Sequence, residues 1–238
     1  MPRPVIHTIP PQFSRMFRCW FLFAAFFLIP VLAQAQDLEP REVALRLQNT
    51  YEKATNMVAD FRQTSAMKFS SRVQKGSGTM IFRKPGQLRW DYQDPSEQVF
   101  LSDGKTFSMY FARSKQMIVS SAREYLQSDV TYSFFTGTGD ILQDFTAAGP
   151  DIANSADNTF LIKLTPRASH PHVAAMYAWV TMNSFLLSHL QIIDHFETVT
   201  DLYFDNIQIN AANYGNRKIE DQLFVFSPPA GTEIIDQF

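Results

Sequence analysis

The chain has 238 residues, with 21 lysines and arginines against 23 aspartates and glutamates, and 45% of its residues are hydrophobic. That apolar content, which includes 22 phenylalanines, excludes a disordered chain, and the charge balance lacks the positive excess typical of nucleic-acid binders. The single cysteine excludes an internal disulfide and cysteine-based zinc or iron–sulfur sites.

The first 35 residues have the pattern of a secretory signal. They contain three arginines and no acidic residue, and an apolar run from Cys19 to Leu32 precedes Ala33-Gln34-Ala35. A basic start, a short apolar stretch and small residues at a cleavage site are typical of export signals. The run is shorter than the ~20 residues that a membrane-spanning helix needs. We therefore expect residues 1–35 to be a cleaved signal peptide and residues 36–238 to form one exported domain.

One amphipathic helix is predicted at the start of this domain. Apolar residues recur at spacings of three and four along one face, at Val43, Leu47, Tyr51, Ala54 and Val58. Pro40 suits a first helical position, and Asp37 and Glu39 place negative charge at the beginning of the helix. The helix should therefore cover an apolar surface.

From residue 59 onward, apolar and polar residues mostly alternate with a period of two, which predicts strands. The expected strands are Ala59–Phe69, Gly78–Arg83, Leu88–Tyr92, Glu97–Ser102, Lys105–Phe111, Gln116–Ser121, Thr159–Thr165, Tyr177–Met182, Leu186–Asp194, Thr200–Ile209 and Leu223–Phe226. Asp103-Gly104 is a strong hairpin signal. Residues 122–149 differ and predict one or two short helices, with Asp140 near the start of the second.

This element order predicts a mainly β protein (α+β), built as an antiparallel barrel or a strongly curved sheet of about ten or eleven strands. A barrel of that size has an interior that side chains need not fill completely. Composition alone does not decide between a solid core and a cavity for a ligand.

Catalytic and metal-binding motifs are weak in this sequence. The chain has no nucleophile elbow, Walker A loop, dinucleotide fingerprint or H-E-x-x-H helix. His170-Pro171-His172 offers two nitrogen ligands without a third nearby. An exposed turn is the better interpretation of this segment, so we expect no metal or cofactor site, while the residues alone leave an enzyme possible without supporting one.

Charge is segregated along the chain. Residues 61–90 hold seven basic residues and no acidic one, whereas residues 91–160 hold ten acidic residues and four basic ones. Solvated strand faces explain such a pattern, and so does a dipolar surface that orients a charged partner.

Several segments resemble one known family. The stretch from Gly78 to Tyr92, GTMIFRKPGQLRWDY, resembles the most recognisable segment of the periplasmic outer-membrane lipoprotein carrier proteins, the LolA family. Asp94–Gln98 and Ser102–Thr106 continue the match at the expected distances. Phe160–Pro166 resembles an internal strand of the family, and Phe224–Gly231 resembles its closing F-x-F-x-P-P-x-G segment. The order of these segments, behind a secretory signal, makes the resemblance specific.

The resemblance implies a fold and a function. The fold would be an incomplete antiparallel β-barrel, with the N-terminal helix and short helices forming a lid over an apolar cavity. The protein would be a periplasmic carrier, not an enzyme, that accepts the acyl chains of lipoproteins from an inner-membrane ABC transporter and passes them to an outer-membrane receptor. We expect a monomer that binds no nucleic acid.

Two sets of site residues follow from this reading. We expect the cavity for acyl chains to be lined by Phe61, Met80, Phe82, Leu88, Trp90, Phe107 and Met109, although some of them could instead form plain core under the lid. In the family, an arginine before the motif's proline is held to latch the lid. Lys84 occupies that position here, next to Arg83, so we expect Lys84 or Arg83 to reach lid carbonyls in residues 122–149.

Two other readings stay open. The protein could be a related half-barrel that binds lipids or senses lipoproteins in the periplasm without carrying them. It could also be a periplasmic esterase or glycosidase, for which a buried carboxylate pair or a serine–histidine contact would be the evidence.

Overall fold

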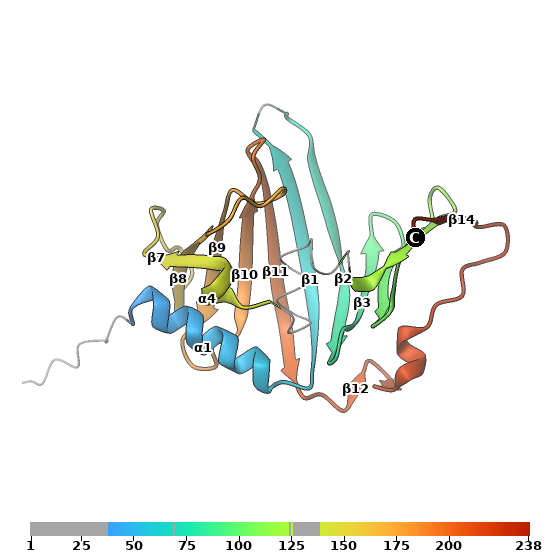
Figure 1. Ribbon diagram of the computed structural model, residues 1–238, viewed down its shortest axis with the longest axis horizontal. Coiled ribbons are helices and arrows are strands. Elements are labelled where there is room, and N and C mark those ends of the chain that lie inside the picture. The colour runs from blue at the N-terminus through green and yellow to red at the C-terminus, as the bar shows by residue number, and fades with distance from the viewer. Residues whose placement is uncertain (1–37, 69, 124, 126–138) are drawn as a thin grey trace, which may run out of the picture. The chain divides into compact units, whose positions relative to one another are not determined.

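A twelve-stranded, strongly curved sheet dominates the computed structural model, which describes residues 38–68, 70–123, 125 and 139–238 (Figure 1). The order of strands across the sheet is β14-β6-β5-β4-β3-β2-β1-β11-β10-β9-β8-β7. Each neighbouring pair is antiparallel except β14 and β6, which are parallel. The sheet is open along β7 and β14, so the expected incomplete barrel is confirmed. The expected signal peptide, residues 1–35, lies outside the described residues.

The strands follow the predicted alternation closely. Their bounds are β1 (Asn56–Met67), β2 (Val73–Arg83), β3 (Gln87–Asp94), β4 (Gln98–Asp103), β5 (Thr106–Phe111), β6 (Gln116–Ser121), β7 (Phe145–Ala148), β8 (Thr159–Pro166), β9 (Ala175–Thr181), β10 (Leu187–Ile193), β11 (Thr198–Ile209) and β14 (Glu233–Asp236). A separate ribbon pairs β12 (Asn213–Tyr214) with β13 (Arg217–Lys218). β1 and β11 pair at the centre of the sheet, with Phe61 opposite Phe204.

One glycine is required where β2 approaches β3. The register between these strands shifts between Ser77 and Gly78, and a Cβ atom at Gly78 would lie 1.9 Å from the carbonyl oxygen of Asp91. Only glycine permits backbones to come this close without displacement.

The predicted N-terminal helix is confirmed as α1 (Pro40–Lys53), which begins at the expected proline. Its buried side chains are Val43, Ala44, Leu47 and Tyr51, which lie along one face as predicted. The predicted continuation of that face to Ala54 and Val58 is wrong, because the helix ends at Lys53 and Val58 lies on β1. α1 lies alongside β7, β8 and α4 (Ile141–Asp144), across one face of the sheet (Figure 1). The helix thus covers an apolar surface, as its amphipathic pattern requires.

The short helix near Asp140 is also confirmed. The Asp140 carboxylate accepts hydrogen bonds from the backbone N–H groups of Leu142 and Gln143, at 2.9 and 3.0 Å, and so caps α4. β7, which follows at once, was not predicted. Most of the segment between β6 and α4, residues 124 and 126–138, lies outside the described residues.

The predicted strand at Leu223–Phe226 is wrong. The structure has a 3₁₀ helix, η1 (Asp221–Phe224), in which the consecutive residues Leu223 and Phe224 are both buried. A strand would direct two consecutive side chains to opposite faces, whereas a helical turn lets both pack against the same sheet. β14, beyond η1, was not predicted either.

The two faces of the sheet carry different apolar clusters. We call the face beneath α1 the inner face; its cluster unites α1 with side chains from β1, β2, β3, β5 and β8 to β11. The opposite, outer face carries three smaller clusters. These are Ile81 with Tyr214, Leu223 and Phe224; Val99 with Leu101, Tyr110 and Met117; and Leu161 with Tyr177 and Trp179.

Candidate functional site

The seven residues expected to line a cavity lie together on the inner face. Six of them are 0–2% exposed and belong to the inner cluster: Phe61, Met80, Phe82, Leu88, Trp90 and Phe107. Met109 is half-buried and packs against that cluster. Strand pairing sets Met80 opposite Trp90 and Phe82 opposite Leu88. The alternation of β1, β2, β3 and β5 therefore assembles one apolar surface from these positions.

A row of aromatic rings continues this surface across the sheet. Phe61 lies 4.8 Å from Tyr92 between ring centroids, and Tyr92 lies 5.3 Å from Phe100. Phe100 in turn lies 5.7 Å from Phe111, on β5. Edge-to-face and tilted contacts at these distances are favourable aromatic packing. The row thus leads from the centre of the inner face toward the end of β5.

α1 supplies the opposite wall of the inner cluster. Tyr51 is the largest of its buried side chains, and its ring lies 6.3 Å from that of Phe82. The Tyr51 hydroxyl accepts a hydrogen bond from the Leu187 backbone N–H at 3.3 Å. Burial raises the pKa of this phenol, although that hydrogen bond acts in the opposite direction. Tyr51 therefore stays protonated and joins the end of α1 to β10.

Lys84 holds the C-terminal end of α1. Its ammonium donates hydrogen bonds to the carbonyl oxygens of Tyr51 at 2.7 Å and Glu52 at 2.9 Å. Partial burial lowers the pKa of the Lys84 ammonium, and the charge of Glu52 opposes that shift. Lysine near a helix C-terminus also complements the helix dipole. These carbonyls belong to α1 rather than to residues 122–149, much of which lies outside the described residues.

Arg83 lies on the outer face instead. Its guanidinium donates to Gln87 at 2.6 Å and forms an ion pair with Asp221. It also lies 4.9 Å from the ring centroid of Phe224. Arg83 therefore fastens η1 to β2, whereas its neighbour Lys84 holds α1.

Sequence reasoning did not single out two features of this site. The carbonyl partners of Lys84 come from a helix about thirty residues away, which no local pattern indicates. The inner face also ends in a polar rim that includes Arg72 and Gln74. The period of two does indicate this rim. Gln74 lies on the same face of β2 as Met80 and Phe82, and Arg72 lies two residues before Gln74.

The described part of the chain shows neither a metal-binding cluster nor a membrane-spanning helix. Within residues 38–68, 70–123, 125 and 139–238, no three histidine, cysteine, aspartate or glutamate side chains are grouped so that they could hold a metal ion. In the same ranges, none of the helices combines the length and the apolar character that crossing a bilayer requires.

Comparisons with known proteins identify relatives along most of the chain. Residues 52–227 match the family described as outer membrane lipoprotein carrier protein LolA. An outer-membrane lipoprotein carrier protein of Nitrosospira multiformis is 28% identical over 80% of this chain and 87% of its own. One from Chromohalobacter salexigens is 27% identical over 93% of this chain and 98% of its own.

One solved structure shows the same fold. An uncharacterised conserved protein of Thermus thermophilus superposes with a TM-score of 0.51 and 11% identity, over 83% of this chain and 98% of that one. At that identity the similarity supports the fold alone.

Proposed function

This chain belongs to the LolA family of outer membrane lipoprotein carrier proteins, and we propose that its inner face binds the acyl chains of lipoproteins. Proteins of this family are lipoprotein chaperones rather than enzymes. The observation that carries the proposal is the inner cluster, in which the seven expected residues and the apolar face of α1 share one surface.

The physical chemistry of the cargo demands such a surface. Burial is worth about 0.8 kcal/mol per CH₂, so three acyl chains with roughly 45 methylenes represent up to ~35 kcal/mol. A lipoprotein with that much exposed apolar surface does not cross water unassisted. Aromatic and methionine side chains suit a carrier because they pack around chains of varied shape without fixed polar demands.

We propose that the acyl chains take the place of α1 on the inner face. Val43, Leu47 and Tyr51 of α1 cover this surface. If α1 moves aside, an acyl chain restores the apolar contacts that the sheet loses. Little apolar burial is then lost in the exchange, so cargo can be accepted and released without a large free-energy change.

The route of the cargo is the second part of the proposal. We propose that the protein acts in the periplasm, receives lipoproteins from an inner-membrane ABC transporter and delivers them to an outer-membrane receptor. The expected signal peptide and the carrier names of the relatives support this route.

A matched pair of variants tests the inner face. Met109 on β5 and Val119 on β6 are both half-buried, but Met109 packs against the inner cluster and Val119 against an outer one. The purified protein is incubated with inner-membrane vesicles that contain a labelled lipoprotein, and soluble complex is measured. An amide among apolar groups costs about 1–3 kcal/mol. We expect Met109→Gln to lower the recovered complex by about tenfold and Val119→Gln to leave it unchanged.

Two outcomes would overturn the proposal. Failure of the wild-type protein to bring lipoprotein into solution is one, and equal losses in both variants is the other. Mass spectrometry of material that co-purifies from the periplasm identifies the natural cargo. A lipid without protein in that material would favour a related lipid-binding protein instead.

A further inference from the structure

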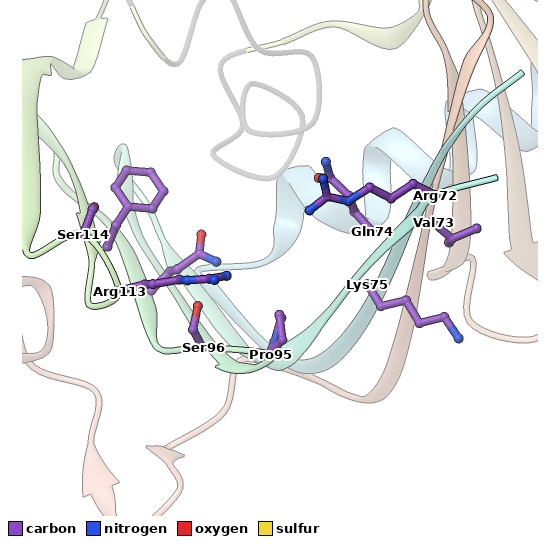
Figure 2. Close-up of a pocket in the computed structure, with 10 residues that line it drawn as sticks. Arg72, Val73, Gln74, Lys75, Pro95, Ser96, Arg113 and Ser114 are labelled. Carbon is purple, nitrogen blue, oxygen red and sulfur yellow. The ribbon is translucent and has the colours of Figure 1, made fainter. Parts of the chain in front are cut away.

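A hollow of about 820 Å³ lies at the end of the inner face (Figure 2). Three segments line it: the start of β2, the turn between β3 and β4, and the turn between β5 and β6. The lining residues are Arg72, Val73, Gln74, Lys75, Pro95, Ser96, Gln98, Phe111, Arg113 and Ser114. Its volume lies in the range of ordinary small-molecule sites.

Strand alternation decides which of these side chains face the hollow. Figure 2 shows Arg72 and Gln74 pointing toward the hollow, and Val73 and Lys75 pointing away from it. The pairing of β2 with β1 is continuous from Val73 to Arg83, so Gln74 shares the face of Met80 and Phe82. The hollow therefore continues the inner face rather than forming a separate outer pocket.

The hollow is cationic. Arg72 and Arg113 bring two positive charges to it, Lys75 adds a third from the opposite face of β2, and its lining contains no acidic residue. Among the ion pairs within the described part of the chain, none involves any of these three side chains. Uncompensated arginines beside a hollow favour an anion, and the planar guanidinium is suited to bidentate binding of phosphate.

One wall of the same hollow is apolar. Phe111 lines it and ends the aromatic row that runs through Phe100 and Tyr92 to Phe61. Gln98, which pairs with Phe111, adds an amide on the adjacent strand. A ligand that fits both features carries a phosphate at one end and a hydrocarbon chain at the other.

We propose that this hollow binds an anionic phospholipid. The phosphate lies between Arg72 and Arg113, where Gln74, Ser96 and Gln98 offer further hydrogen-bond donors, and the acyl chain runs along Phe111 and Phe100 toward the inner cluster. An acidic protein segment would satisfy the arginines but would make no use of the aromatic row, so the lining favours a lipid. The proposal does not depend on lipoprotein transport.

Soluble probes test the proposal directly. Dihexanoylphosphatidylglycerol is titrated into the purified protein below its micelle-forming concentration, and inorganic phosphate, glycerol phosphate and an aspartate-rich peptide are titrated separately. The dissociation constants come from isothermal titration calorimetry. We expect the lipid to bind more tightly than all three other probes, and added salt to weaken that binding.

A charge-matched pair of double variants isolates the hollow. Arg72→Gln with Arg113→Gln removes two of its charges, whereas Arg41→Gln with Lys218→Gln removes two exposed charges on α1 and β13. All four side chains are exposed, so folding should be preserved, and thermal unfolding verifies this. We expect the first double variant to bind the lipid about tenfold more weakly, which corresponds to about 1.4 kcal/mol. The second should match the wild type.

Three results would overturn this inference. They are unchanged lipid affinity in the hollow variant, binding of inorganic phosphate as tight as that of the lipid, and tighter binding of the acidic peptide, which would assign the hollow to a protein partner. Failure of the lipoprotein assay described above would not alter these measurements. The two proposals can therefore fail separately.

Discussion

The inner and outer faces of the sheet are covered in different ways. α1 covers the inner face with apolar side chains, and the polar contacts that hold its C-terminal end come from Lys84 and from the Leu187 backbone. The segment that contains β12, β13 and η1 covers part of the outer face. Hydrogen bonds and the ion pair between Arg83 and Asp221 surround its small apolar cluster. Our proposal treats the inner cover as the one that acyl chains replace, whereas the polar contacts of the outer cover favour a fixed one.

The outer contacts are dense and directional. Arg89 forms an ion pair with Asp91 at 2.8 Å, and both side chains are less than a fifth exposed. Arg89 also donates to the carbonyl oxygen of Leu223 at 3.0 Å, and the Tyr214 hydroxyl donates to Asp91 at 2.8 Å. Burial, together with the charge of Asp91, raises the pKa of Tyr214, so this phenol stays protonated. Breaking such a buried polar set leaves unpaired groups, which is costly.

The largest expected effect concerns the outer cover. Phe224 is 1% exposed, and its truncation would leave a cavity beneath η1. We expect Phe224→Ala to lower the free energy of unfolding by about 3–5 kcal/mol in denaturant titrations. Phe196→Ala is the control, because that side chain is 81% exposed and should contribute less than about 0.5 kcal/mol. Equal effects in both variants would remove the distinction between a fixed outer cover and ordinary surface.

An intermediate effect is expected where α1 is held. Lys84→Met keeps the side-chain stem but removes the donors to Tyr51 and Glu52. Hydrogen bonds of this kind contribute roughly 1–2 kcal/mol, so amide hydrogen exchange in α1 should become about 5- to 30-fold faster. Exchange in β3 and β4 should change little. The exposed residue Lys105 provides the matched control, Lys105→Met. Unchanged exchange in α1 would show that Lys84 does not hold the helix.

The smallest expected effect is a dependence of folding stability on pH that comes from Asp151, which contacts Lys163 and Tyr177. Hydrogen bonds from Lys163, and next from Tyr177, lower the pKa of Asp151 to about 2. A lowered carboxyl pKa stabilises the folded state above the unfolded value of about 3.9, and that contribution is lost as the pH falls toward 2. We expect Lys163→Met to raise the pKa of Asp151 in an NMR titration, whereas Lys105→Met should not change it. An unchanged titration of Asp151 would contradict the assignment.

Alternation along the strands explains why much of the inner face was predictable. Met80 and Phe82 are two residues apart, and so are Leu88 and Trp90, so each pair shares a face whatever the register of the sheet. The helix was equally readable, because Val43, Leu47 and Tyr51 are one turn apart. Whether this surface binds acyl chains stays a prediction.

Contacts between distant segments were not readable from the sequence. Nothing local indicates that Lys84 reaches carbonyls of α1 or that Arg83 meets Asp221, since both contacts depend on how the chain returns to the sheet. Leu223–Phe226 suggests a strand by its apolar content alone, because four apolar residues in succession do not alternate with a period of two. β14 is four residues long and is defined by its parallel pairing with β6, which no short pattern predicts.

The central pairing of β1 with β11 has a consequence for synthesis. Met57 lies opposite Ile209 in this ladder, so about 150 residues separate two neighbours at the middle of the sheet. A chain that emerges from the ribosome amino end first therefore keeps one side of β1 without its partner until nearly the whole polypeptide has followed. Such distant pairings form slowly, so the sheet can be completed only late in the life of the nascent chain.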